Sequence, residues 1–434
     1  MKQAYQKQPE LFNTAEQHYE RVHHTPHGVV LVWERLAEGR RWHKIHPRTG
    51  SAPALLSAHQ GGFDRYISVN EFHGWRVVRQ LRSLRSCFVD IDGYTDLHGA
   101  LEACKDAMLP SPTLAVMSGR GIHLYWEIDA VPAQALPVWQ RVQNSLIEQL
   151  AAVQLPVDVK VKDCTRVLRL VGSKHAKTGQ DVRGVQIQPW RWTLHTLADE
   201  VLGFRPEKPE PQPIQPQAPA PVRSLDAARV RAGRQVRTAT GSIYDWWHLV
   251  YRDLITIGDA NLLGIPEGHR DAWLFLYGVA LSWFTQPDSL ASEVEAVART
   301  YTPGLKIGEV RSAIAPTLAK ATAAAAGETI TWNGQARDPR YWFKRATLLD
   351  WIGPVIPADL YPQLRAIIPD QLRTERRNAA ERARYADHNT GQGYRSSSAQ
   401  DAASARLMRA KGQSLRSIAD ELGVSLRTVQ RWTA

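Results

Sequence analysis

Two carboxylates at the end of an apolar run are the residues of this sequence best placed to do chemistry. Residues 88–93 read FVDIDG, so Asp90 and Asp92 alternate with Ile91 before a glycine. This pattern predicts a buried strand that runs out at the edge of a site. Side chains two positions apart on a strand point the same way, about 6.6 Å apart. Such carboxylates repel each other unless they are protonated, hydrated or bound to a cation, and their hard oxygens suit Mg²⁺ or Mn²⁺.

A glycine-rich turn between two predicted strands, 113–117 and 122–126, supplies further candidates. The turn reads SGRG from Ser118 and is followed directly by Ile122 and His123. Its glycines permit positive φ and a close approach of backbone to a ligand, and Arg120 places a guanidinium beside that approach. A plain hairpin turn and a packed core histidine are the alternative interpretations of this segment.

A basic segment follows a predicted amphipathic helix at 136–152. Residues 157–174 read VDVKVKDCTRVLRLVGSK, in which Asp158 and Asp163 lie within a dozen residues of several cations. The groups suited to binding phosphate are Arg166, Arg169, Lys174 and His175. Guanidinium groups form charge-assisted pairs with phosphate oxygens, so this segment predicts an anion-binding surface next to a carboxylate.

Several further elements must position these groups. Strands are predicted near 28–33, 66–69 and 185, and helices at 75–84, 97–108 and 194–201. The expected fold class of this part of the chain is an α+β (α/β) domain.

Composition and charge set the broad class of the protein. The chain has 434 residues, of which 43% are hydrophobic and 22% charged, enough for two or three domains. Its formal net charge of +11 favours a polyanionic partner. Residues 360–434 hold 13 Lys and Arg against 7 Asp and Glu, so the tail carries much of that charge.

The cysteine spacing and several missing motifs disfavour other classes of protein. The three cysteines are far apart, which indicates reduced core thiols rather than disulfides or a zinc module. There is no Walker A sequence of a P-loop helicase. The N-terminus does not read as a signal peptide, and no apolar run approaches 18 residues, so we expect a protein of the bacterial cytosol or nucleoid with no membrane partner.

Proline marks the main domain boundary. Seven of the sixteen residues from Pro206 to Pro221 are proline, which predicts an extended linker. After it, helical periodicity at 246–257, 270–283 and 289–301 predicts an all-α, Trp-rich domain. The expected parts are a catalytic domain at 1–204, a linker at 205–240, a helical accessory domain at 241–370, a basic flexible joint at 371–402 and a helix-turn-helix at 403–434.

The last residues have the pattern of two short helices joined by a turn. Gly423 is the predicted turn and Ser425 the cap of the second helix, which directs Val429 and Trp432 inward. The residues then expected to face a DNA major groove are Arg427, Thr428, Gln430 and Arg431. A helical hairpin that contacts protein is the alternative interpretation.

The segments FVDIDG, SGRGIHLYW and VDVKVKDCTRVLRLVGSK occur in this order and together resemble the archaeo-eukaryotic primase superfamily, in particular the primase-polymerases of plasmids and phages. The resemblance covers about residues 28–202. It implies a mixed sheet in an RRM-like catalytic module, and the helical domain after the linker resembles, more loosely, the one that follows primase modules.

The resemblance also implies roles for individual residues. Asp90 and Asp92 match the metal-binding pair of the first motif, His123 matches the histidine that contacts nucleotide phosphates, and Asp158 best matches the third metal ligand. The implied nucleotide-binding residues are Ser118, Arg120, His123, Arg166, Arg169, Lys174 and His175. There are two departures, because Gly121 occupies a position where many members have Ser, and Asp163 competes with Asp158.

The function implied is that of a DNA primase or primase-polymerase, a nucleotidyltransferase that starts replication of a plasmid or phage-like replicon. It would use two Mg²⁺ or Mn²⁺ ions, nucleoside triphosphates (NTP or dNTP), a single-stranded DNA template and a separate replicative helicase. The three carboxylates could hold both cations. The alternative is a non-catalytic replication initiator or regulator that binds double-stranded DNA through the C-terminal helices. A nickase is disfavoured because the chain lacks a paired-histidine motif.

Overall fold

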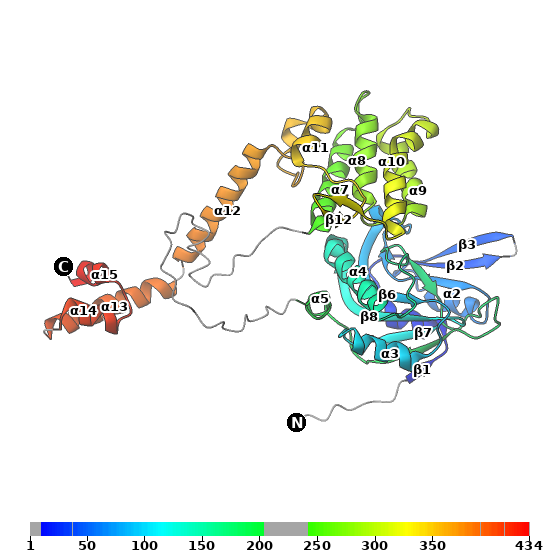
Figure 1. Ribbon diagram of the computed structural model, residues 1–434, viewed down its shortest axis with the longest axis horizontal. Coiled ribbons are helices and arrows are strands. Elements are labelled where there is room, and N and C mark those ends of the chain that lie inside the picture. Colours follow the sequence, from blue (N-terminus) through cyan, green and yellow to red (C-terminus); the bar gives the residue numbers. More distant parts are fainter. Residues whose placement is uncertain (1–9, 37, 204–241, 391, 412, 434) are drawn as a thin grey trace. The chain divides into compact units, whose positions relative to one another are not determined.

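The computed structural model describes residues 10–36, 38–203, 242–390, 392–411 and 413–433. Contacts between Cα atoms divide the chain into two compact units, residues 1–367 and 368–434 (Figure 1). The predicted linker at 205–240 lies outside the described residues. No described helix combines the length and the apolar character that a membrane span requires.

A six-stranded sheet forms the centre of the first unit. Side by side, its strands are β1 (Glu10–Phe12), β10 (Arg183–Gln186), β7 (Leu114–Met117), β8 (Ile122–Pro132), β6 (Leu81–Ile91) and β5 (Glu71–Phe72). Every pairing between these strands is antiparallel, so the predicted mixed sheet is wrong. The crossover from β6 to β7 through α3 (Leu97–Asp106) does not make a parallel pair, because β8 lies between the two strands.

Helix α4 (Leu136–Ala152) packs on β6, where β5 is too short to continue the sheet (Figure 1). The amide side chain of Gln143 accepts a hydrogen bond from the Phe88 backbone N–H (2.9 Å) and donates one to the Phe88 carbonyl (2.6 Å). Trp139 donates through Nε1 to the Ser86 carbonyl at 2.9 Å. These contacts satisfy backbone groups of the central strand that would otherwise be buried without a partner.

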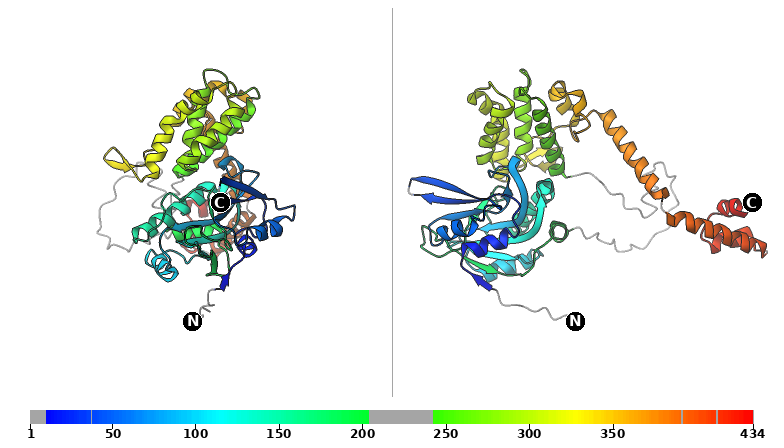
Figure 2. Two further views of the ribbon diagram at one scale, coloured as in Figure 1. Left: turned by 90° about the vertical axis from the view of Figure 1, so that its right-hand side faces the viewer. Right: turned by 180° about the vertical axis from the view of Figure 1, so that it is seen from behind.

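A four-stranded antiparallel sheet lies beside the first one. Its strands, in order, are β3 (Gly39–Ile45), β2 (Val30–Leu36), β4 (Arg65–Ser68) and β9 (Val167–Arg169). One face packs on α1 (Ala15–Val22) and α2 (Ala52–His59) through a core cluster that includes Val32, Ile67 and Leu56. The β2–β3 hairpin extends from the body of this unit (Figures 1 and 2).

The predicted helix at 75–84 is wrong. Only Val78–Gln80 (η1) forms a single 3₁₀ turn, and Leu81 already begins β6. Leu81 pairs with Phe72 and Ser83 with Pro132, so pairing with two neighbouring strands overrides the local helical pattern. The predicted strands at 28–33, 66–69, 113–117 and near 185, and the predicted helices at 97–108, 136–152 and 194–201 (α5, Leu194–Leu202), are confirmed within a few residues.

Helices dominate the remainder of the first unit. They are α7 (Ile243–Ala260), α8 (Arg270–Leu281), α9 (Pro287–Tyr301), α10 (Ile307–Ala325) and α11 (Arg345–Ile352). Two 3₁₀ turns follow α11, η3 (Gly353–Val355) and η4 (Ala358–Leu360). A further 3₁₀ turn, η2 (Ala133–Ala135), precedes α4 in the sheet-containing part. The three predicted helices are confirmed, and Trp247 and Trp273 are fully buried in their core. The all-α prediction needs one correction, because β11 (Ile330–Trp332) and β12 (Gln335–Arg337) form an exposed hairpin.

Polar contacts join these helices to the sheet-containing part of the same unit. Glu293 on α9 is buried and accepts a hydrogen bond from the backbone N–H of Val78 at 3.0 Å. Asn144 on α4 donates to the hydroxyl of Tyr244 on α7 at 2.6 Å. The guanidinium of Arg79 donates to the hydroxyl of Tyr301.

The second unit consists of helices α12 (Asp370–Thr390), α13 (Gln392–Ala410), α14 (Leu415–Glu421) and α15 (Leu426–Thr433). Helical backbone therefore occupies the described part of the predicted joint at 371–402. Ala405, Ile418, Ala419 and Val429 form its apolar core. Gly423 has φ +62°, and the Ser425 hydroxyl accepts a hydrogen bond from the Thr428 N–H at 3.2 Å, as the predicted turn and cap require.

Candidate active site

Strand pairing between β6 and β8 brings two of the predicted site residues together. Asp90 lies directly opposite His123 in the register, so their side chains share one face of the sheet. His123 Nε2 lies 3.5 Å from Asp90 Oδ1. Asp92 follows the last residue of β6, is 61% exposed at its side chain, and places Oδ1 3.4 Å from the Arg120 guanidinium.

Asp158 meets the same strand end from a distant part of the chain. Its backbone N–H donates to the Asp90 carbonyl at 2.8 Å, and Val157 forms a β-bridge with Ile91. The Asp158 carboxylate accepts a hydrogen bond from the Lys160 N–H at 2.9 Å. Asp158 is half-buried at the start of a turn that follows the bridge.

The carboxylate of Asp163, the competing candidate for the third ligand, is held by contacts with its own segment of the chain. It is buried. Its carboxylate accepts from the Thr165 N–H at 3.0 Å and forms an ion pair with Arg166 at 3.0 Å. The structure therefore brings Asp158, and not Asp163, into contact with the backbone of Asp90.

The electrostatics of Asp90 reflect a concentration of carboxylates. Burial, and then the charges of Asp92 and Asp158, raise the pKa of Asp90 to about 7. Arg166 and Arg169 act in the opposite direction. Near pH 7 the Asp90 carboxyl is thus partly protonated in the absence of a further cation, as expected for a carboxylate that lacks enough positive charge nearby.

His123 is held in its neutral form. Burial, and then the charge of Arg169, lower the pKa of His123 to about 3. Its Nδ1 is buried and has no hydrogen-bond partner among the described residues. A neutral imidazole has one N–H donor, which can be offered to an anionic ligand without the desolvation cost of a buried charge.

The donors at this strand end fit a hard divalent cation, although their side chains do not converge. No group of three or more His, Cys, Asp or Glu side chains within the described ranges is arranged to hold a metal ion. Asp92 turns toward Arg120, and Asp158 toward the Lys160 N–H. Asp92 is exposed and Asp158 is half-buried. Three carboxylates are the oxygen donor set that Mg²⁺ and Mn²⁺ prefer.

The glycine-rich turn explains one departure from the primase pattern. Ser118 and Gly121 close the turn with two hydrogen bonds, from Ser118 N–H to the Gly121 carbonyl (2.9 Å) and from Gly121 N–H to Ser118 Oγ (3.2 Å). A Cβ atom at Gly121 would lie 2.2 Å from the Ile91 carbonyl oxygen. No side chain fits there with this backbone. Gly119 has φ +89° and lies against His175, so the turn and the basic segment are neighbours.

The predicted phosphate-binding residues differ in their surroundings and in their exposure. Arg169 is the most central, because its charge acts on both Asp90 and His123. Arg166 is engaged with Asp163. The more peripheral residues are Arg120 and Lys174, whose side chains are about half exposed, and His175, which is buried and whose pKa is lowered by burial.

Two residues near Arg169 were missed by the sequence analysis. Asp64 accepts a hydrogen bond from Arg169 at 2.6 Å, and the Arg169 guanidinium lies over the Tyr66 ring at 4.9 Å. Burial acts to raise the pKa of Asp64, but the hydrogen bonds from Arg169 and the Ala176 N–H hold it below its ordinary value. Only their position at a predicted strand could have pointed to them, because the pairing with β9 is non-local.

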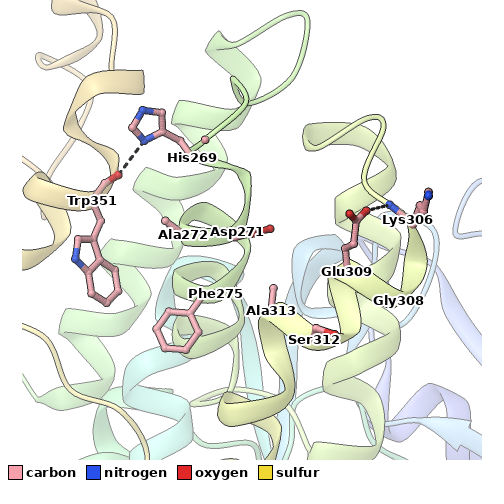
Figure 3. Close-up of a pocket in the computed structure, with 11 residues that line it drawn as sticks. His269, Asp271, Ala272, Phe275, Lys306, Gly308, Glu309, Ser312, Ala313 and Trp351 are labelled. Atoms are coloured by element: carbon pink, nitrogen blue, oxygen red, sulfur yellow. Dashed lines mark hydrogen bonds between the residues drawn. The ribbon is translucent and has the colours of Figure 1, made fainter.

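A cavity of about 900 Å³ lies elsewhere in the first unit, among its helices (Figure 3). Phe275 and Trp351 supply aromatic walls, and His269 Nδ1 lies 3.2 Å from the Trp351 carbonyl oxygen. Lys306 and Glu309 line the opposite side, where the Lys306 N–H donates to the Glu309 carboxylate. The carboxylates of β6 do not line this cavity.

The predicted DNA-facing residues all lie on α15 of the second unit. Arg427, Gln430 and Arg431 are exposed, whereas Thr428 is half-buried next to Ser425. Val429 and Trp432 pack toward α13 and α14, as predicted. The exposed face of α15 is therefore basic and polar.

No protein-family model matches the chain. A replication protein of Clostridium perfringens is 28% identical over 232 residues, 51% of this chain and 51% of that protein. This chain thus spans about half the length of that curated relative. The similarity agrees with the resemblance to plasmid and phage primases of the archaeo-eukaryotic superfamily that the three motifs indicate.

Two solved structures are also similar. One is the primase-polymerase (AEP) domain of cyanophage S-2L, with 21% identity and a TM-score of 0.35 over 43% of this chain and 96% of that one. The other is the primase RepB', with 15% identity and a TM-score of 0.25 over 66% of this chain and 92% of that one.

Proposed function

We propose that this protein is a DNA primase or primase-polymerase that starts replication of a plasmid or phage-like replicon. The observation that supports it most directly is the meeting of three separate segments at the end of β6. Asp90, Asp158 and His123 are joined there by strand register and a backbone hydrogen bond. The similarity to a replication protein is consistent with this class of function.

Asp90, Asp92 and Asp158 would hold two Mg²⁺ or Mn²⁺ ions. The chemistry supplied there would be activation of an attacking 3′-hydroxyl and neutralisation of the triphosphate. A direct transfer from the nucleotide to a 3′-hydroxyl would need no side-chain nucleophile of the protein. Positioning and charge stabilisation then supply most of the acceleration.

The remaining site residues bind and orient the nucleotide. The charge of Arg169 acts on both Asp90 and His123, and its guanidinium would pair with the phosphates of an NTP or dNTP. His123 donates its single N–H to a phosphate oxygen while remaining neutral. Arg120, Arg166, Lys174 and His175, with the hydroxyl of Ser118, complete the proposed nucleotide-binding set.

We further propose that α14 and α15 form a helix-turn-helix that binds double-stranded DNA. The contact surface would be the exposed side of α15, with Arg427, Gln430 and Arg431 toward base edges or phosphates and Thr428 at its edge. A separate replicative helicase completes the proposed set of partners. A non-catalytic initiator that uses only this unit is the competing function.

Template-dependent incorporation of labelled nucleotides, with Mg²⁺ or Mn²⁺ and then with chelator, tests the proposal. We expect metal-dependent synthesis that Asp90→Asn reduces at least about 10²-fold, the scale of losing a key electrostatic contact. Asp106→Asn, an exposed carboxylate at the end of α3, is the matched control and should retain activity. Sequence-specific duplex binding without any nucleotide incorporation would favour the non-catalytic initiator instead.

A further inference from the structure

Aromatic side chains form a row across the four-stranded sheet. The pairing register sets Trp42 opposite Trp33, Trp33 opposite Tyr66, and Tyr66 opposite Arg169. Residues directly opposite each other in a sheet project from the same face. We call Trp42, Trp33 and Tyr66 the aromatic row, and Arg169 lies at its end. With strands about 4.8 Å apart, the distance from Trp42 to Arg169 is roughly 14 Å.

Neighbouring members of the row touch one another. The ring centroids of Trp33 and Tyr66 lie 4.4 Å apart, and those of Trp33 and Trp42 lie 6.2 Å apart. At the far end, Trp75 meets Trp42 at 5.3 Å, and the Arg76 guanidinium lies over the Trp42 ring at 4.7 Å. The aromatic surface is therefore continuous from Trp75 to Tyr66.

The row is on the face of the sheet opposite to the core. Val32 and Ile67, each next in sequence to a member of the row, point to the other face and join the core with α1 and α2. The three members of the row are half-buried, and Trp75 is 37% exposed. Packing alone would not require three large aromatic rings on the side away from the core, where they remain partly open to solvent.

Positive charge flanks the row. Arg35 on β2 and Arg40 on β3 lie opposite each other in the register, on the same face as the row and two positions beyond its tryptophans. Both are exposed. Lys44 lies on the other side, with its ammonium 5.7 Å from the Trp75 ring. Glu34, by contrast, belongs to the opposite face by strand alternation. This face therefore combines planar aromatic rings with exposed cations, the combination that binds single-stranded nucleic acid.

The row leads into the candidate active site. Arg169 contacts Tyr66 and acts electrostatically on Asp90 and His123. A single DNA strand lying along the row would thus have one end at Arg169, the residue whose charge acts on the candidate site. Asp64, the acidic residue beside this end of the row, is buried. The Arg169 guanidinium compensates its negative charge, so Asp64 adds little repulsion toward phosphate.

We propose that the aromatic row binds the single-stranded DNA template as it enters the candidate active site. Bases stack against Trp42, Trp33 and Tyr66, while Arg35, Arg40 and Lys44 pair with the phosphates. Stacking on aromatic rings tolerates any base, as a template site requires. The inference rests on the proposed function, because a template is needed only where nucleotides are joined.

The test measures binding of a fluorescein-labelled single-stranded DNA of mixed sequence to the full-length protein by fluorescence anisotropy. Trp42→Ala should raise the Kd about tenfold, within the range reported for loss of one stacking ring. Trp42→Phe, which keeps an aromatic ring, should stay close to the wild type. Trp190→Ala removes an exposed tryptophan outside the four-stranded sheet and is the control.

A second measurement does not depend on the variants folding. Photocrosslinking of wild-type protein to DNA that contains 5-iodouracil, followed by mass spectrometry, should label peptides with Trp33, Trp42 or Tyr66. Crosslinks confined to other peptides, or unchanged DNA binding by a folded Trp42→Ala protein, would overturn the inference.

Nucleotide incorporation by the same variants separates this inference from the proposed function. If both are correct, Trp42→Ala raises the KM for template and leaves the rate at saturating template close to that of the wild type. If the wild type incorporates nucleotides and its template KM does not change in Trp42→Ala, the row is not the template site although the proposed function stands. If the wild type incorporates none but Trp42→Ala still weakens DNA binding, the row binds DNA and the proposed function fails.

Discussion

The two sheets of the first unit are built alike but carry different kinds of side chain at their candidate binding surfaces. Both are antiparallel, and in both a register of opposite residues determines which side chains meet. The six-stranded sheet brings Asp90, His123 and Asp158 to one point. The four-stranded sheet instead spreads Trp42, Trp33 and Tyr66 along a line. A cluster of carboxylates suits catalysis of bond formation, whereas a row of aromatic rings suits binding of a nucleic acid strand. Substitutions in the two sheets should therefore affect different quantities.

The largest effect should come from the six-stranded sheet. Asp90→Ala should abolish nucleotide incorporation, a loss of at least about 10²-fold, because Asp90 is the carboxylate that lies opposite His123 and whose backbone carbonyl contacts Asp158. Its affinity for single-stranded DNA, measured by anisotropy, should remain within about twofold of the wild type. Equal losses of activity and DNA affinity would contradict the separation between the two sheets.

The second prediction distinguishes Asp158 from Asp163. Asp158→Asn should lower activity strongly and leave the melting temperature nearly unchanged, because Asp158 is half-buried and its own backbone makes the contact with Asp90. Asp163→Asn should do the reverse and lower stability by about 1–3 kcal/mol, because it weakens a buried ion pair with Arg166. Activity assays and thermal unfolding of both variants check this. A fully active Asp158→Asn protein would remove it from the proposed metal site.

The third prediction concerns acid stability and Glu71 on β5. Although burial acts to raise its pKa, the hydrogen bond and charge of His23, the charge of Arg85 and the Ser83 hydroxyl lower the pKa of Glu71 to about 2. Because the folded-state pKa is below the ordinary value of 4.5, its stabilising contribution is complete above pH 4.5 and is lost as the pH falls toward 2. It amounts to roughly 3 kcal/mol.

Urea unfolding of the wild type and Glu71→Gln between pH 7 and pH 3 measures that contribution. The wild type should lose more stability than the variant over this range, since only the wild type takes up a proton at position 71 on unfolding. Parallel pH dependences of the two proteins would show that Glu71 has no lowered pKa.

The smallest effect is expected from a substitution in the second unit, which belongs to neither sheet. Arg427→Ala should weaken binding to a duplex that contains the protein's own site by about 1–3 kcal/mol if the guanidinium pairs with a guanine edge. Nucleotide incorporation and single-stranded DNA affinity should not change. Arg377→Ala, an exposed arginine on α12, is the matched control. Loss of duplex binding in both variants would indicate a general charge effect instead of recognition by α15.

Local patterns in the sequence were enough to predict most of the elements and the candidate residues. The alternation in FVDIDG and the apolar runs on both sides of SGRG predicted β6, β7 and β8, and a 3.6-residue period predicted α4 with its bounds. The turn at Gly423 and the cap at Ser425 were also predictable. These signals depend on residues within a few positions of one another.

What the tertiary structure alone decided are the contacts between distant segments. Pairing with β8 and β5 extended β6 back to Leu81 and removed the predicted helix at 75–84. The hydrogen bond from the Asp158 N–H to the Asp90 carbonyl is likewise a contact between distant segments. The aromatic row exists only because β3, β2, β4 and β9 pair in one register. Register is set by burial and pairing across the whole sheet, and no local pattern along one strand contains it.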